Sequence, residues 1–336
     1  MTWSSPTEDE WAAAVEALAA PGELLLTCHL NPDGDALGSA LGLGLALRRA
    51  GRQVSVSFTE PLTVPDTLAH LPGQELLVAA ADAPARPDVL VTFDTGSLDR
   101  LGELAGRVES AGRVIVIDHH ASNTAYGDIH LIDPSAAATA VLVAELLDRL
   151  GLSIGHDVAA CLYTGISTDT GSFRYAATTP QVHQLAARLL ATGIRHDLIA
   201  RELYDSHPYA WVSLTGEILS RAALEPKAAG GLGLVWTYST IADLRSRDLG
   251  MDQVEGVIDI VRTAREAEVA AVYKEQADGS WAASLRSKGR IDIGQISVDL
   301  GGGGHRFAAG FTAHGPIEVV VKQLQAALDA APHVPG

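Results

Sequence analysis

The chain has 336 residues, of which 47% are hydrophobic, and its formal net charge is −17. Proteins that hold long nucleic acid usually present a basic surface, so this charge argues against a long duplex as the ligand and leaves small anions open. The length favours two domains. Because the sequence has neither a long apolar run nor a signal pattern, we expect no membrane contact and no export. The two cysteines lie in apolar segments, which indicates a reduced, cytoplasmic protein.

The first elements lead to a polar turn. Thr7 and Glu10 form a capping-box pattern that predicts a helix ending near Pro21. The apolar run 24–28 predicts a buried strand. A helix rich in glycine, alanine and leucine is expected over 36–50, and its glycines should let it pack closely on a sheet.

Between that strand and that helix lies the turn His29-x-x-x-Asp33-x-Asp35. One imidazole and two carboxylates form the mixed nitrogen and oxygen set that suits Mn²⁺, Mg²⁺, Zn²⁺ or Co²⁺. The alternative is a polar turn in which Asp35 caps the helix. The turn lacks the G-x-G-x-x-G pattern of a dinucleotide site.

Strands and helices alternate over the next hundred residues, which predicts a doubly wound parallel sheet of the α/β class. The expected strands are 54–58, 88–93, 113–117 and 129–132, and the expected helices are 136–150 and 157–167.

Two of these strands end on side chains that can bind a metal. Asp94 follows one strand, and Asp118, His119 and His120 follow another. A single Asp at a strand end is commonly a turn residue or a cap. Ligands collect at the carboxyl ends of parallel strands, so these ends together with the turn at His29 favour a metal site.

The alternation of strands and helices ends near Thr178. Helices are expected over 180–191, 195–203 and 208–224, before a β-rich segment. In that segment strands are expected at 232–238, 268–275 and 280–286, with a helix over 254–265. The predicted boundaries are a catalytic domain at 1–192, a helical linker at 193–225, a smaller α/β domain at 226–331 and a disordered tail at 332–336.

Four motifs resemble those of the DHH phosphoesterase superfamily in order and spacing. They comprise His29, Asp33 and Asp35, then Asp94, then Asp118, His119 and His120, and finally Asp169. In the C-terminal half, SLRSK at 284–288 and GGGGH at 301–305 resemble the DHHA1 domain of the NrnA-type branch. That branch comprises bifunctional oligoribonucleases (nanoRNases) that also hydrolyse 3′-phosphoadenosine 5′-phosphate (pAp), and some members act on cyclic di-AMP and its linear product pApA.

The resemblance implies two divalent metal ions, expected to be Mn²⁺ with Mg²⁺, Co²⁺ or Zn²⁺ as alternatives. The first would be bound by His29, Asp33 and Asp94, and the second by Asp35, Asp94, His119 and Asp169. Two ions about 3.5–4 Å apart lower the pKa of a water between them and neutralise phosphoryl oxygens.

The resemblance also implies roles for the remaining motif residues. Asp94 would be shared by both ions and His120 would face the substrate phosphate. Asp118 would support the site without binding a metal ion itself. Because the side chains of adjacent residues diverge, His120 is not expected to bind the same ion as His119.

The C-terminal domain is expected to hold the far end of the substrate. Arg286 can bind a phosphate bidentately or stack on a base, and the glycine run can form an anion nest or a flexible loop. The residues expected to bind substrate are Ser284, Arg286, Lys288, Gly302, Gly303, Gly304 and His305.

The expected activity is hydrolysis of short oligonucleotides (nanoRNA, pApA, cyclic di-AMP) to mononucleotides and of pAp to AMP, by water attack on phosphorus. The expected partners are short single strands and nucleotide phosphates, with neither a long duplex nor a membrane, and a homodimer is expected at the level of the family. A family II inorganic pyrophosphatase-like hydrolase and a non-catalytic cyclic-dinucleotide sensor remain alternatives. The sequence does not rank the substrates or indicate the polarity of cleavage.

Overall fold

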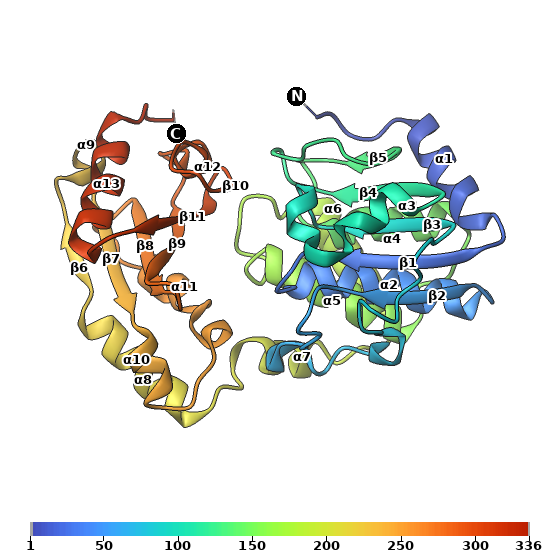
Figure 1. Ribbon diagram of the computed structural model, residues 1–336, viewed down its shortest axis with the longest axis horizontal. Coiled ribbons are helices and arrows are strands. Elements are labelled where there is room, and N and C mark those ends of the chain that lie inside the picture. The colour runs from blue at the N-terminus through green and yellow to red at the C-terminus, as the bar shows by residue number, and fades with distance from the viewer. Residues whose placement is uncertain (1–2, 335–336) are drawn as a thin grey trace. The chain divides into compact units, whose positions relative to one another are not determined.

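The computed structural model describes residues 3–334, and these fall into two compact units that meet between Ser206 and His207 in the sequence (Figure 1). The two helices of the expected linker 193–225 are divided between the units. Helix α7 (His196–Tyr204) belongs to the first unit and α8 (Tyr209–Ser220) to the second. The segment is therefore shared by the two units.

The first unit is built on a five-stranded sheet in the order β2-β1-β3-β4-β5, and every neighbouring pair is parallel. The predicted α/β parallel sheet is confirmed. The strands are β1 (Glu23–Cys28), β2 (Gln53–Ser57), β3 (Val89–Phe93), β4 (Arg113–Asp118) and β5 (Ile129–Ile132). The strand order reverses between β1 and β3, the position at which open α/β sheets bind ligands.

Helices cover this sheet (Figure 1). They are α1 (Glu8–Ala19), α2 (Gly34–Arg49), α3 (Gly106–Ser110), α4 (Thr139–Arg149), α5 (His156–Asp169), α6 (Pro180–Leu190) and α7. Short 3₁₀ segments lie at Asp66–Leu68, Gln74–Leu76 and Leu98–Ala105. The predicted capping box of Thr7 and Glu10 is present at the start of α1.

Helix α2 is buried from Gly34 to Leu47. Its glycines serve a different contact from the one expected. A Cβ on Gly38 would lie 2.5 Å from the backbone oxygen of Cys161 on α5, and one on Gly42 would lie 3.2 Å from the side chain of Leu162 on the same helix. Glycine therefore lets α2 approach α5, and only Gly44 faces side chains of the sheet strands.

The second unit contains a mixed six-stranded sheet in the order β10-β11-β9-β8-β7-β6. Its strands are β6 (Ala223–Glu225), β7 (Leu234–Ser239), β8 (Val269–Glu275), β9 (Ser280–Ser287), β10 (Gly303–His305) and β11 (Ala308–His314). Its helices are α8, α9 (Ala228–Gly231), α10 (Ile241–Arg245), α11 (Val257–Val261), α12 (Ile293–Asp299) and α13 (Ile317–Ala330), with a 3₁₀ turn at Met251–Val254.

Several elements of the second unit differ from the sequence expectation. The helix expected over 254–265 is limited to the short α11 and the preceding 3₁₀ turn. Helix α13 was not predicted, although Val320, Leu324 and Leu328 repeat at helical spacing and are buried. The expected disorder of the tail 332–336 is wrong as far as the structure describes it. His333 forms a β-bridge with Ile291, and positions 335–336 lie outside the described residues.

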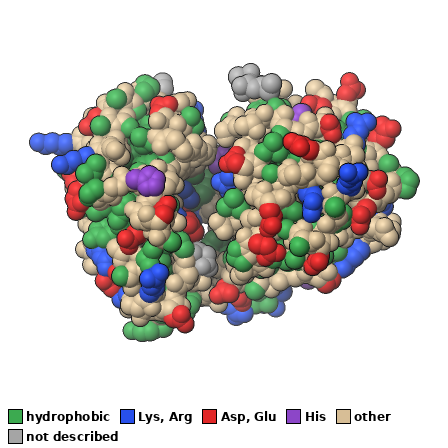
Figure 2. All heavy atoms as spheres, viewed as in Figure 1, with side chains coloured by type: hydrophobic (Ala, Val, Ile, Leu, Met, Phe, Trp, Pro, Cys, Tyr) green, Lys and Arg blue, Asp and Glu red, His purple; other side chains and the backbone are tan. Residues whose placement is uncertain are grey.

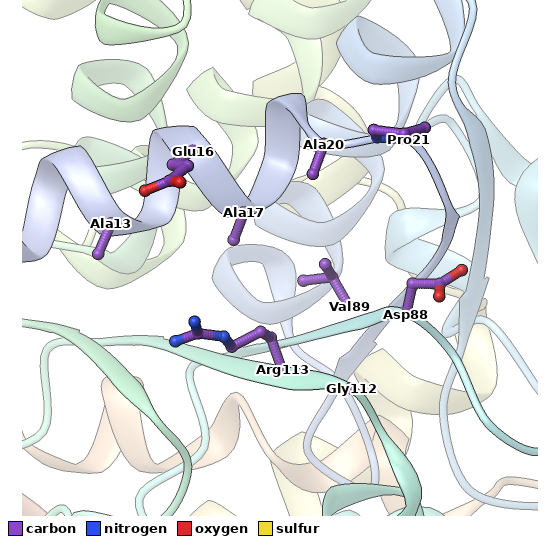
Figure 3. Close-up of a pocket in the computed structure, with 9 residues that line it drawn as sticks. All are labelled: Ala13, Glu16, Ala17, Ala20, Pro21, Asp88, Val89, Gly112 and Arg113. Carbon is purple, nitrogen blue, oxygen red and sulfur yellow. The ribbon is translucent and has the colours of Figure 1, made fainter.

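Two surface features bear on function. On the face shown in Figure 2, acidic and basic side chains are interspersed over the first unit. A pocket at the amino ends of β3 and β4 is lined by α1 and contains Glu16, Asp88 and Arg113 (Figure 3). It lies at the edge of the sheet opposite the carboxyl ends of the strands.

Within residues 3–334, the helices are too short or too polar to span a bilayer.

Candidate metal centre

The candidate site lies at the carboxyl ends of β1, β3 and β4, beside the last turn of α5. His29 follows β1, and its Nδ1 lies 2.8 Å from the backbone oxygen of Leu30. Because a carbonyl oxygen only accepts, Nδ1 carries the hydrogen, and Nε2 of the neutral ring offers a lone pair. That Nε2 lies 3.5 Å from Asp94 Oδ2 and 3.9 Å from Asp33 Oδ2. The ligand atoms of these three residues lie within 4.8 Å of one another.

The alternative in which Asp35 caps the helix is wrong, because the cap of α2 is Asp33. Asp33 Oδ1 accepts hydrogen bonds from the backbone N–H groups of Asp35 and Ala36, at 3.1 and 3.0 Å. Its side chain is 54% exposed, and its second oxygen is the one nearest His29. Asp33 can therefore cap the helix with one oxygen and offer the other to a metal.

Asp35 is fully buried inside the first turn of α2. Its carboxylate accepts hydrogen bonds from the backbone of Thr139 at 2.6 Å and of Ala140 at 2.9 Å. These N–H groups belong to the first turn of α4, which begins at Thr139, three residues later than predicted. A helix N-terminus favours a negative charge, so α4 stabilises Asp35 as a carboxylate and fixes its direction.

Asp94 lies at the centre of the site and is 4% exposed. Its Oδ2 faces His29, while Oδ1 lies 3.3 Å from His119 Nε2 and accepts a hydrogen bond from the Thr139 hydroxyl at 3.1 Å. Its backbone is left-handed, with φ of 53°. Asp and Asn tolerate this region better than other residues with a side chain, and such conformations concentrate at functional sites.

His119 and Asp169 complete the cluster. Nδ1 of His119 lies 3.1 Å from the backbone oxygen of Ala136, so its Nε2 is directed at the carboxylates, as in His29. That Nε2 lies 3.1 Å from Asp169 Oδ2 and 3.9 Å from Asp35 Oδ2. Asp169 is the last residue of α5, which runs two residues further than predicted.

Asp118 and His120 form an arrangement beside this cluster. Asp118 is fully buried, and its Oδ1 accepts from the backbone N–H groups of His119 and His120 and lies 2.7 Å from His120 Nδ1. Its Oδ2 accepts from Asn123 Nδ2 at 2.6 Å. Both oxygens of Asp118 are engaged by donors, so this carboxylate orients His120 and is poorly placed to bind a metal.

The sequence reasoning missed Thr139 and Asn123. Thr139 contacts both Asp35 and Asp94, through its backbone and its hydroxyl, and Asn123 holds Asp118. No local pattern marks either residue. The sequence offered one indication of their role: Thr139 and Asn123 each lie a few positions after the end of a strand, in the region where ligand sites of parallel sheets are assembled.

The charges of the cluster shift its pKa values in opposite directions. Burial raises the pKa of Asp35 well above its usual range, and the charges of Asp169 and Asp94 raise it further. Burial also acts to raise the pKa of Asp94, but the neighbouring histidines, His120 first, hold it well below its usual range. Burial opposes protonation of His119, yet the neighbouring carboxylates of Asp169 and Asp94 raise its pKa well above that of free histidine. The site therefore attracts positive charge.

These observations fit divalent cations. Two Nε2 lone pairs and four carboxylates converge, and the carboxylates of Asp35 and Asp94 are buried, which is costly without a compensating positive charge. Three groups of potential ligands share Asp94: one with His29 and Asp33, one with Asp35 and His119, and one with Asp118 and His120. In the last group both oxygens of Asp118 are already engaged by donors, so the first two groups are the candidate metal sites. Mixed imidazole and carboxylate donors suit Mn²⁺, Mg²⁺, Co²⁺ or Zn²⁺.

We expect Asn123→Ala to lower turnover roughly tenfold, because a lost hydrogen bond to Asp118 loosens the orientation of His120. Steady-state hydrolysis of pAp with saturating Mn²⁺, the substrate and metal expected from the sequence, measures this. Ser122→Ala is the matched control, since Ser122 is exposed and next in sequence. Equal rates for the two variants would show that Asn123 has no part in positioning.

The residues expected to bind substrate lie in the second unit. Ser284 and Arg286 alternate on β9, and Arg286 Nε lies 3.7 Å from Asp259 on α11. Lys288 lies beyond the end of β9, and its ammonium donates to the backbone oxygen of Ala264. Arg286 and Lys288 therefore already have partners that a substrate phosphate would have to replace or join.

The glycine run is more ordered than a flexible loop. Residues 303–305 form β10, in which Gly303, Gly304 and His305 pair with β11. A Cβ on Gly302 would lie 2.1 Å from the backbone oxygen of Gly310, so this glycine is required for close packing of the chain. A Cβ on Gly303 would meet nothing within 4 Å, so close packing does not require glycine at this position.

Comparison with known proteins gives a consistent result for both units. The family model described as "DHH family, N-terminal domain" matches residues 23–166, and that described as "DHHA1 domain" matches residues 236–333. The bifunctional oligoribonuclease and PAP phosphatase NrnA of Thermus thermophilus is 35% identical over 297 residues, which span 88% of this chain and 86% of the relative. A probable enzyme of the same name from Streptococcus mutans is 26% identical over 87% of this chain and 89% of its own.

Among solved structures, an exopolyphosphatase-related protein from Bacteroides fragilis superposes with a TM-score of 0.86 at 27% identity, over 96% of both chains.

Proposed function

The chain belongs to the DHH/DHHA1 phosphoesterase family, and we propose that it is a Mn²⁺-dependent hydrolase of short nucleotidic phosphoesters. Its substrates would be oligoribonucleotides of a few residues, pApA and pAp, with cyclic di-AMP as a further candidate. The observation that carries the proposal is the convergence of three strand ends on Asp94. Relatives named as oligoribonuclease and PAP phosphatase support the choice of substrates.

His29, Asp33 and Asp94 would hold one divalent ion, and Asp35, Asp94, His119 and Asp169 the other. The two ions would lower the pKa of water and withdraw charge from phosphoryl oxygens. The chain's own part is to fix their ligands. Hydrogen bonds from α4 direct Asp35, and two backbone carbonyls set the tautomers of His29 and His119.

His120 would act directly on the substrate. Its ring is 22% exposed, and Asp118 accepts the hydrogen of its Nδ1 at 2.7 Å. Burial opposes protonation of His120, but the charge of Asp94 and the hydrogen bond to Asp118 raise its pKa above that of free histidine. A protonated His120 can use Nε2–H to donate to a phosphate oxygen and then give its proton to the departing oxygen.

The second unit would bind the rest of the substrate. Arg286 would hold a distal phosphate or stack on a base, with Ser284, Lys288 and His305 beside it. Gly302, Gly303 and Gly304 would let a nucleotide approach the backbone. The homodimer and the cytoplasmic location inferred from the sequence stay predictions.

A substrate panel with Mn²⁺ tests the proposal. We expect rapid hydrolysis of pAp, pApA and a 5′-labelled trimer, and slow hydrolysis of a long single strand and of pyrophosphate. Fastest turnover of pyrophosphate would instead support the pyrophosphatase alternative. Binding of cyclic di-AMP without turnover of any substrate would support a sensor.

A further inference from the structure

The permanently charged basic side chains of the first unit are all arginines, because its sequence up to Ser206 contains no lysine. Within the part of the chain that the structure describes, all of these arginines except Arg86, Arg100 and Arg113 make an ion pair or hydrogen bond through the side chain. An engaged guanidinium is less available to a ligand, so these three are the candidates to meet an anion.

Two of the three arginines lie at the amino ends of the strands, away from the candidate metal centre. Arg113 is the first residue of β4 and lines the pocket beside α1 (Figure 3), and Arg86 precedes the start of β3. Both therefore belong to the amino-end edge. Arg100 lies on the 3₁₀ segment Leu98–Ala105, which follows the carboxyl end of β3.

Hydrogen bonds tie the backbone of Arg100 to the metal centre. Its carbonyl oxygen accepts from Leu30 N–H at 2.8 Å, and the oxygen of Leu30 in turn faces His29 Nδ1 at 2.8 Å. Two consecutive hydrogen bonds thus separate the Arg100 backbone from the imidazole of His29. The position of Arg100 at the rim is set by the turn that supplies the first group of ligands.

The side chain of Arg100 is exposed, while its backbone is held beside the turn that carries His29. Among residues 3–334, no carboxylate lies within ion-pair distance of Arg100, although Asp33 and Asp94 are close to His29. The guanidinium remains open to an incoming anion.

The net charge of the proposed metal centre explains why an arginine beside it would help to bind a phosphate. Two divalent ions carry four positive charges, and four aspartates (Asp33, Asp35, Asp94 and Asp169) carry four negative charges. The loaded cluster is therefore neutral as a whole and attracts a phosphate only at short range. A guanidinium at the rim can attract a phosphate from further away and can bind two of its oxygens.

We propose that Arg100 binds non-bridging phosphate oxygens of the substrate at the rim of the metal centre. The inference rests on the proposed function and extends it: the first unit supplies its own phosphate-binding side chain in addition to the metal ligands and His120. Arg100 contributes to substrate binding and has no part in holding the metal.

The test compares Arg100→Gln with the wild-type protein in hydrolysis of pAp at saturating Mn²⁺. We expect KM to rise roughly tenfold or more, the effect of losing a hydrogen bond to a charged group, while kcat changes less than about threefold. Arg100→Lys keeps the charge and loses the planar fork, so its KM should fall between the two. Arg86→Gln and Arg113→Gln are matched controls, with KM within about twofold of wild type.

Calorimetric titration with Mn²⁺ and thermal melting accompany the kinetics, and both should match wild type in Arg100→Gln. An unchanged KM, an equal rise in the controls, or a loss of Mn²⁺ affinity would each overturn the role of Arg100. If the wild-type protein did not hydrolyse pAp, the proposed activity on pAp would fail. Calorimetric binding of pAp would then decide about Arg100: weaker binding by Arg100→Gln supports the inference, and equal or absent binding overturns it.

Discussion

Asp94→Asn is expected to reduce Mn²⁺-dependent hydrolysis of pAp by roughly 10³-fold, equivalent to about 4 kcal/mol of transition-state stabilisation. Asp94 is the carboxylate that the group with His29 and Asp33 shares with the group of Asp35 and His119, and one of its oxygens faces His29 while the other faces His119. Asn tolerates the left-handed backbone at this position and matches the size of Asp, so the substitution removes charge with little strain.

Mn²⁺ binding by calorimetry should weaken in parallel, since each site loses a charged ligand. Asp82→Asn is the control, because Asp82 is exposed and lies in the loop before β3. Thermal melting without metal checks that Asp94→Asn folds. Retention of a tenth of wild-type turnover on every substrate would contradict a shared metal ligand.

His120→Ala is expected to lower kcat about 10²-fold while Mn²⁺ still binds with wild-type affinity. The physical reason is the arrangement around Asp118. One oxygen of this carboxylate accepts from Nδ1 of His120 and the other from Asn123, so Asp118 orients the ring, and Nε2 is the atom that would act on the substrate. The measurements are single-turnover hydrolysis of pApA and calorimetric Mn²⁺ titration.

A matched control for this variant is His156→Ala, because His156 is exposed at the start of α5. Its rate and metal affinity should equal those of the wild type. Loss of Mn²⁺ binding in His120→Ala would instead make His120 a metal ligand. An unchanged rate would remove it from the chemistry altogether.

The sequence alone determined the strands of the first unit and the residue types at their ends. Apolar runs such as those of β1 and β3 are buried on both faces, so their composition is sufficient to locate them. His29 and Asp94 stand directly after such runs, and the rule that parallel strands present their carboxyl ends at one edge brings them together. Each of these residues directly follows the strand that presents it, so the sequence read along the chain is sufficient to find them.

The tertiary structure decided how the site is held. Asp35 accepts hydrogen bonds from Thr139 and Ala140, more than a hundred positions away in the sequence. Which N–H groups a buried carboxylate meets depends on how helices pack, and no local pattern encodes it. The same holds for the glycine run: Gly302 is required because the backbone of Gly310 passes beside it. Composition therefore identified the chemical groups, and packing between distant elements fixed their orientation.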